Sequence, residues 1–292
     1  MRGIVLAIAV CTTVCEFSSA ETISLPKTCS QFRDAVVSIQ IGQQPDGTGF
    51  LVTKDGYILT AHHVAYSPEG NPFSPLTITL SDGSAFEAKS VLPSTVENTG
   101  QDYALLKISA QKELPFLSLG DPTDIQIGAD AAIIGFPFSA ISKSGPPVDQ
   151  KFCLSATFAA TNTESVTVNF EVKNVGRGGV VTSTKGQQGV WVHVVYFQGP
   201  SVKGVSGSPL IARDSGRVVG IVSTKLTGIG DSLVQLEKET AAGAGNNVSI
   251  SGLVPGPAIY EIVTTLDRQL ANGLGSAVGI DEPKKALQKA KK

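Results

Sequence analysis

The sequence predicts an all-β protein of two six-stranded antiparallel β-barrels followed by a C-terminal α-helix. Short runs of β-branched and aromatic residues recur along the chain, and turn sequences separate them. Two of these turns contain Asp-Gly pairs, at 55–56 and 82–83, which favour tight hairpins. The chain has 292 residues, 41% of them hydrophobic, which is enough to fill one large or two ordinary domains.

The first block of predicted strands lies in residues 21–122. Its six strands occupy about 75 residues, which leaves no room for helical crossovers and favours a small antiparallel barrel or sandwich. The predicted strands are 34–42, 47–53, 57–61, 76–80, 85–91 and 103–109.

A second block of similar size lies in residues 123–235, and we expect it to form a second barrel. Its predicted strands are 131–137, 151–161, 165–172, 189–197, 208–212 and 217–224. Residues 236–292 are expected to hold a loop, a helix and a basic tail. Apolar residues at helical spacing, from Ile259 to Leu270, predict a helix over 256–275 that packs on the second barrel.

The N-terminus has the pattern of a secretory signal peptide over residues 1–20. Arg2 precedes an apolar run of about 13 residues, and Ser18 and Ala20 are the small residues that signal peptidase requires, with cleavage after Ala20. A membrane anchor would need about 20 apolar residues. Cys11 is an alternative lipid acceptor, but Val10 before it is larger than such a site prefers. We expect a periplasmic or secreted protein without a membrane span.

Charge and cysteine content exclude several classes of function. A net charge of −2 disfavours general binding to nucleic acid or anionic membranes. The lysine-rich segment 284–292 is expected to be a solvated, frayed tail rather than a docking patch. After signal cleavage only Cys29 and Cys153 remain, and they form either one disulfide or two buried thiols. No metal-ligand spacing is present, so we expect no metal or cofactor.

Three residues are candidates for nucleophilic catalysis. His63 closes the predicted strand in "YILTAHHV", Asp102 precedes the strand in "DYALLKI", and Ser206 lies in the small-residue stretch "KGVSGSPLI". A serine hydroxyl needs a neighbouring imidazole to take its proton, and a carboxylate on the other ring nitrogen fixes the tautomer. His63 and Asp102 fall in the first block and Ser206 in the second, so we expect the site in a cleft between the barrels.

The strings that carry these residues resemble those of chymotrypsin-fold serine proteases, most closely the bacterial Deg/HtrA type. "GTGFLVTKDGYILTAHHV", "ITLSDGSAFEAKSV", "DYALLKI", "LSLGDPTDIQIGADAAIIGFPFS" and "GVSGSPLIARDSGRVVGIVS" follow that family's order over about residues 34–140 and 203–224. The resemblance implies a triad of His63, Asp102 and Ser206. It also implies an oxyanion hole from the N–H groups of Gly204 and Ser206.

The resemblance further implies a substrate-binding strand at Val222, Ser223 and Thr224. The glutamyl endopeptidases carry a histidine there and trypsins an acid at the pocket base, and this chain has neither. We therefore expect a small or medium apolar residue before the scissile bond. Only 36 residues follow Gly256, so we expect no PDZ domain after it. Val205 replaces the aspartate that captures a new N-terminus in digestive members, so activation by cleavage is not expected.

Several residues and one segment have alternative interpretations. We expect His62 and His193 to be structural, and Ser208, the rival nucleophile, to be a buried hydroxyl that supports the turn. Segment 141–200 resembles the family poorly. It holds extra strands and Gly-rich turns, and we expect it to form the loops that shape the substrate groove. The function predicted from the resemblance is an exported serine endopeptidase that cleaves proteins or peptides. The alternative is a catalytically silent secreted homologue that acts as a binding protein.

Overall fold

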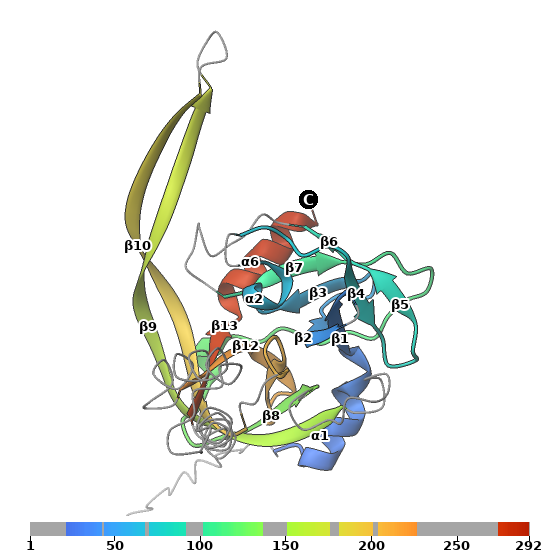
Figure 1. The fold of residues 1–292 in the computed structure, drawn as a ribbon. Coiled ribbons are helices and arrows are strands. Elements are labelled where there is room, and N and C mark those ends of the chain that lie inside the picture. Colours follow the sequence, from blue (N-terminus) through green and yellow to red (C-terminus); the bar gives the residue numbers. More distant parts are fainter. Residues whose placement is uncertain are drawn as a thin grey trace, which may run out of the picture.

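The computed structural model describes residues 22–42, 44–67, 70–91, 102–136, 151–175, 181–200, 204–226 and 274–291. Within these ranges the chain forms two β-sheet units with short helices around them (Figure 1). The helical elements are α1 (Leu25–Phe32), η1 (Arg33–Ala35), α2 (His62–Ala65), η2 (Pro122–Asp124) and α6 (Asp281–Ala290). The expected signal peptide lies outside the described residues.

The first unit is a curved antiparallel sheet. Its strands are β1 (Val36–Ile41), β2 (Gln44–Leu51), β3 (Tyr57–Thr60), β4 (Leu76–Thr79), β5 (Ala85–Glu87), β6 (Lys89–Ser90) and β7 (Ala104–Lys107). They are ordered β5-β4-β1-β2-β3-β7-β6. Only Ala88 separates β5 from β6, so the two edges of the sheet belong to one bent strand and the sheet is a nearly closed barrel.

The second unit is a closed antiparallel barrel of six strands. These are β8 (Asp130–Gly135), β9 (Phe152–Val175), β10 (Val181–Gln198), β11 (Pro209–Ala212), β12 (Arg217–Leu226) and β13 (Leu274–Gly279). Around the barrel the order is β10-β13-β12-β11-β8-β9. The predicted fold class is confirmed: the protein is all-β, with two barrel-like sheets and a short C-terminal helix.

Strands of the second barrel are buried on both faces because they contact two cores. Apolar runs such as "AAIIG" and "VVGIV" lack the polar alternation of half-exposed strands, and this is the pattern that burial on both faces produces. Residues inside the barrel include Ile133, Leu210, Val219, Val222 and Ala277. Their chain neighbours pack with the first sheet: Ile134, Ile211, Val218, Ile221 and Val278.

The long hairpin of β9 and β10 differs from the sequence prediction. The polar residues 162–164 indicated a break between two strands, but they pair with 192–194 and the strand runs on without interruption. At its base β9 pairs with β8 and β10 pairs with β13, and beyond these contacts the two strands pair with each other. The hairpin therefore projects away from the barrel (Figure 1). The strands predicted at 151–161, 165–172 and 189–197 coincide with parts of this hairpin, which also includes residues 162–164 and 181–188.

The C-terminal segment also corrects the predicted domain boundary. Strand β13 belongs to the second barrel, so this barrel does not end at residue 235, and the helix predicted over 256–275 cannot include 274 and 275. The remainder of that predicted helix lies outside the described residues.

The lysine-rich tail forms most of α6 instead of fraying. Pro283, Ala286 and Leu287 are buried at i, i+3 and i+4. Ala286 and Leu287 belong to the core that includes the first sheet, and the helix contacts β7. The Tyr57 hydroxyl donates a hydrogen bond to the carbonyl of Ala290 at 3.1 Å. The sequence pattern did not reveal this apolar stripe because lysines, which lie on the other faces of the helix, dominate the composition of the segment.

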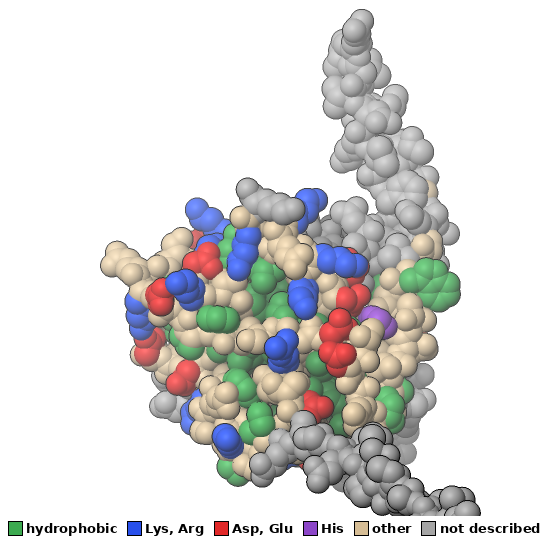
Figure 2. All heavy atoms as spheres, turned by 180° about the vertical axis from the view of Figure 1, so that it is seen from behind, with side chains coloured by type: hydrophobic (Ala, Val, Ile, Leu, Met, Phe, Trp, Pro, Cys, Tyr) green, Lys and Arg blue, Asp and Glu red, His purple; other side chains and the backbone are tan. Residues whose placement is uncertain are grey.

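Charges of both signs are mixed on the face of the molecule shown in Figure 2. Lys and Arg side chains lie among Asp and Glu side chains there, and among the described residues on this face they form no extended basic patch. Such a patch is the usual feature of a nucleic-acid binding surface.

A disulfide joins Cys29 of α1 to Cys153 of β9. The two cysteines are 124 residues apart in the sequence, so the bond links the N-terminal helix to the base of the long hairpin.

We expect replacement of both cysteines by serine to lower the free energy of unfolding by about 2–4 kcal/mol, because a long loop is no longer closed in the unfolded chain. Denaturant unfolding of the oxidised wild type and the double variant measures this difference. Wild type with reductant is the matched control and should behave like the variant. Equal stability of all three samples would contradict the prediction.

Candidate active site

His63 lies in α2, a single helical turn that follows β3. Its side chain is 48% exposed. The adjacent His62 is buried, and its ring stacks on Tyr66 with 4.6 Å between centroids. The two histidines therefore point in different directions, and both lie on a helical turn rather than at the end of the predicted strand.

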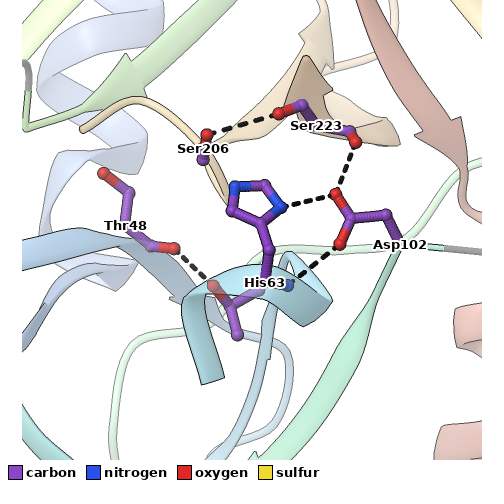
Figure 3. A network of polar contacts seen from close by, with 6 residues as sticks. Thr48, His63, Asp102, Ser206 and Ser223 are labelled. Carbon is purple, nitrogen blue, oxygen red and sulfur yellow. Dashed lines mark hydrogen bonds and ion pairs between the residues drawn. The ribbon is translucent and has the colours of Figure 1, made fainter. Parts of the chain in front are cut away.

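The carboxylate of Asp102 accepts three hydrogen bonds. Its Oδ1 accepts from the backbone N–H of His63 at 3.0 Å, and its Oδ2 accepts from His63 Nδ1 at 2.7 Å. The Ser223 hydroxyl also donates to Oδ2, at 2.5 Å (Figure 3). Burial favours the neutral acid, but the bonds and charge of His63 and the bond from Ser223 outweigh it, so the pKa of Asp102 lies below its ordinary value of 3.8.

An ionised Asp102 fixes the tautomer of His63. A carboxylate only accepts hydrogen bonds, so Nδ1 carries a proton, and in the neutral imidazole Nε2 is then the acceptor. In Figure 3 the imidazole lies between Asp102 and Ser206. The ring therefore presents a proton acceptor on the side of the serine.

Ser206 lies in the turn that leads into β11. Gly204 and Gly207 flank it with φ angles of +99° and +84°, a backbone region that favours glycine. A Cβ on Gly207 would lie 2.0 Å from the carbonyl oxygen of Thr48, so only glycine fits behind the serine. The Ser206 hydroxyl donates to the carbonyl of Ser223 at 3.3 Å, a long hydrogen bond.

Two backbone amides of this turn remain available as donors. Within the described part of the chain, the N–H groups of Gly204 and Ser206 donate no hydrogen bond. A pair of such donors near a nucleophile can stabilise an oxyanion that develops on a substrate carbonyl.

The strand predicted to bind substrate has two further roles that the sequence did not reveal. The Val222 side chain lies in the barrel core, while its N–H donates to Ser208 and its C=O accepts from Gly207, so Val222 supports the Ser206 turn. Between Val222 and Thr224 the pairing of β12 with β13 shifts by one residue. The resulting bulge turns Ser223 toward Asp102, and no local sequence signal indicates such a bulge.

The geometry contains the parts that acyl transfer requires: a hydroxyl, an imidazole with a fixed tautomer, an orienting carboxylate and two amide donors. A family model for the trypsin-like peptidase domain matches residues 47–221, more than half of the chain. The chain belongs to the trypsin-like peptidase family. His63, Asp102 and Ser206 all lie within the matched range.

Curated relatives of this trypsin-like peptidase are serine proteases. It is 43% identical over 94 residues to a probable periplasmic serine endoprotease DegP-like of Chlamydia trachomatis. The aligned segment covers 32% of this chain and 16% of the relative. The protein of that name from Halomonas elongata is 37% identical over 92 residues, 32% of this chain and 17% of the relative. Serine protease HTRA1 of Xenopus tropicalis is 31% identical over 183 residues, 62% of this chain and 32% of the relative. The chain thus spans about a third or less of these relatives, and the predicted relationship to Deg/HtrA proteases is confirmed.

The neighbours of Ser206 in this trypsin-like peptidase have structural positions. Val205 is buried among the core residues of the second barrel. Ser208 is fully buried and its hydroxyl has no hydrogen-bond partner within the described residues, so its backbone rather than its hydroxyl supports the turn. His193 lies on β10 with Nδ1 3.7 Å from the carboxylate of Asp281, on the first turn of α6.

The trypsin-like peptidase shows no metal-binding cluster in its described residues. No group of three or more His, Cys, Asp or Glu side chains gathers there at metal-binding distances. None of the helices in the described part of the chain is long and apolar enough to cross a membrane.

Replacing Ser223 by alanine tests the bond between Ser223 and Asp102. A carboxyl with a lowered pKa in the folded state stabilises the fold above its ordinary pKa, and this stability is lost as the pH falls through the folded value. Ser223→Ala removes one donor and so raises the folded pKa of Asp102. We therefore expect the acid-side loss of stability to begin at the same pH as in wild type, near the ordinary pKa, but to be smaller and to end at higher pH.

Unfolding free energies measured between about pH 2 and 6 check this shift. Ser30→Ala is the matched control, because the Ser30 hydroxyl bonds to the carbonyl of Lys27, far from Asp102 along the chain. Identical acid profiles of Ser223→Ala and wild type would contradict the assignment.

Proposed function

We propose that the protein is an exported serine endopeptidase that hydrolyses peptide bonds through an acyl-enzyme. The observation that carries this proposal is the double hydrogen bond from His63 to Asp102, which fixes both the backbone and the ring of the histidine. With the ring held in this way, His63 is the general base, Asp102 is its orienting partner and Ser206 is the nucleophile.

In the first step Ser206 Oγ attacks the carbonyl carbon of the scissile bond, and its proton passes to Nε2 of His63. The ring becomes an imidazolium, which the Asp102 carboxylate stabilises through Nδ1. The negative charge moves to the substrate oxygen, to which the N–H groups of Gly204 and Ser206 donate hydrogen bonds as the oxyanion hole. In the resting protein the Ser206 hydroxyl donates to Ser223, so it has to rotate toward His63 before this attack.

The intermediate then collapses and the C–N bond breaks. His63 gives its proton to the leaving amine, and the acyl group stays on Ser206 as an ester. Water attacks the ester by the same route: His63 takes a proton from water, the second intermediate collapses, and the proton returns to Ser206. The cycle ends with an acid, an amine and the original enzyme.

The substrate class and location are parts of the same proposal. Relatives with the matched segment bear the names of serine endoproteases, some of them periplasmic, which supports proteins or peptides as substrates and a periplasmic or secreted location. The proposed signal peptide is 1–20, with cleavage after Ala20. The proposed first barrel is 21–122, and the proposed second barrel starts at 123 and includes β13. Ser223 and Thr224 remain the proposed substrate-binding positions.

A fluorophosphonate probe tests the function directly, because it forms a covalent bond only with an activated serine hydroxyl. We expect wild-type protein to be labelled at Ser206 and to cleave casein. Ser206→Ala should show neither activity and should unfold at the wild-type temperature.

Ser208→Ala is the matched control, because it removes a hydroxyl two residues away that is buried and makes no hydrogen bond within the described residues. This variant should be labelled and active like wild type. Absence of an adduct on folded wild-type protein, alongside a reactive control protease, would refute the enzyme proposal and favour a binding protein.

A further inference from the structure

Thr48 of β2 connects the first barrel to the turn that carries Ser206. Its backbone N–H donates to the carbonyl of Ser206 at 3.0 Å. Its hydroxyl donates to the carbonyl of Gly204 at 2.8 Å and accepts from the N–H of Phe136 at 3.0 Å. One residue of the first barrel therefore binds the carbonyls of both residues whose N–H groups form the proposed oxyanion hole.

These two bonds anchor the residues that carry the donors. A peptide unit is planar, so a held Gly204 carbonyl fixes the unit that joins Gly204 to Val205, including the Cα of Gly204. The N–H of Gly204 belongs to the preceding unit, which turns relative to the held unit only about φ and ψ of Gly204. The observed φ of +99° is open to glycine without strain, so neighbouring φ values are open to it as well. The restraint has to come from outside the turn.

Thr48 is itself held rigidly. It is fully buried, and the hydroxyl of Thr60 donates to its carbonyl at 2.7 Å (Figure 3). The same carbonyl lies against Gly207, where a Cβ would approach it to 2.0 Å. Removing the Thr48 hydroxyl would leave two buried polar groups, the carbonyl of Gly204 and the N–H of Phe136, without this partner.

We propose that Thr48 is a positioning residue for the oxyanion hole: its hydroxyl holds the Gly204 carbonyl and so anchors the residue whose N–H stabilises the transition state. This inference rests on the proposed function. A positioning role of Thr48 differs from a purely stabilising role in its kinetic effect. The hydrogen bonds to the oxyanion strengthen in the transition state, so loss of the Thr48 hydroxyl should lower kcat more than it raises KM.

The test compares Thr48→Val, which removes the hydroxyl and keeps the shape, with Thr48→Ser, which keeps the hydroxyl. We expect Thr48→Val to lower kcat for a peptide substrate and the rate of fluorophosphonate labelling about tenfold or more, with KM within about twofold of wild type. Thr48→Ser should restore both rates to within about threefold of wild type.

The matched control is Thr28→Val in α1. Thr28 is also fully buried, and its hydroxyl donates to one backbone carbonyl, that of Ser24, at 3.1 Å. This control should lower the unfolding temperature without changing kcat. If Thr48→Val is poorly folded, Thr48→Ala removes the same hydroxyl without placing a methyl group against the two polar groups.

Three outcomes would overturn the inference while leaving the proposed function intact. These are a folded Thr48→Val or Thr48→Ala protein with wild-type kcat, an equal loss in Thr48→Ser, or failure of both hydroxyl-free variants to fold, which would assign Thr48 to stability alone. Failure of wild-type protein to react with the probe would refute the proposed function instead.

Discussion

The relative position of the two barrels depends on strands that are buried on both faces. On β8, β11 and β12, alternate side chains fill the second barrel and pack against the first sheet, so neither unit can slide without opening a core. Strand β11 begins three residues after Ser206. The apolar contact between the barrels therefore brings the serine turn to the histidine of the other unit, and the polar site needs only fine adjustment by hydrogen bonds.

That adjustment uses backbone groups as much as side chains. Asp102 accepts from the backbone N–H of His63, and the backbone of Val222 holds Gly207 and Ser208. The backbone N–H of Thr48 donates to the carbonyl of Ser206. Backbone donors lose no side-chain entropy when they form such bonds, so their geometry varies little. The partly buried carboxylate of Asp102, next to three donors, stays ionised even though burial alone would raise its pKa.

The sequence predicted most strands because their signals are local. Each predicted strand of the first block coincides with one observed strand or, at 85–91, with the bent pair β5 and β6, and the Asp-Gly turns lie where two hairpins close. Predictions failed where distant contacts decide the structure. Strand β13, "LGSAVG", has weak strand propensity and exists because β10 and β12 pair with it on both sides. Helix α6 is stabilised by the first sheet, and the bulge at Ser223 depends on the register with β13.

Strand β13 is the last strand of the second barrel in the sequence, and this order favours strand exchange between molecules. Residues 227–273 separate β13 from β12, yet β13 completes the hydrogen bonding of two strands that would otherwise each have an open edge. An open edge accepts any extended segment, including the same strand from another molecule. Chains cut within 227–273 that lose the final strand would therefore expose two edges at once, and self-association through those edges is the expected fate of such fragments.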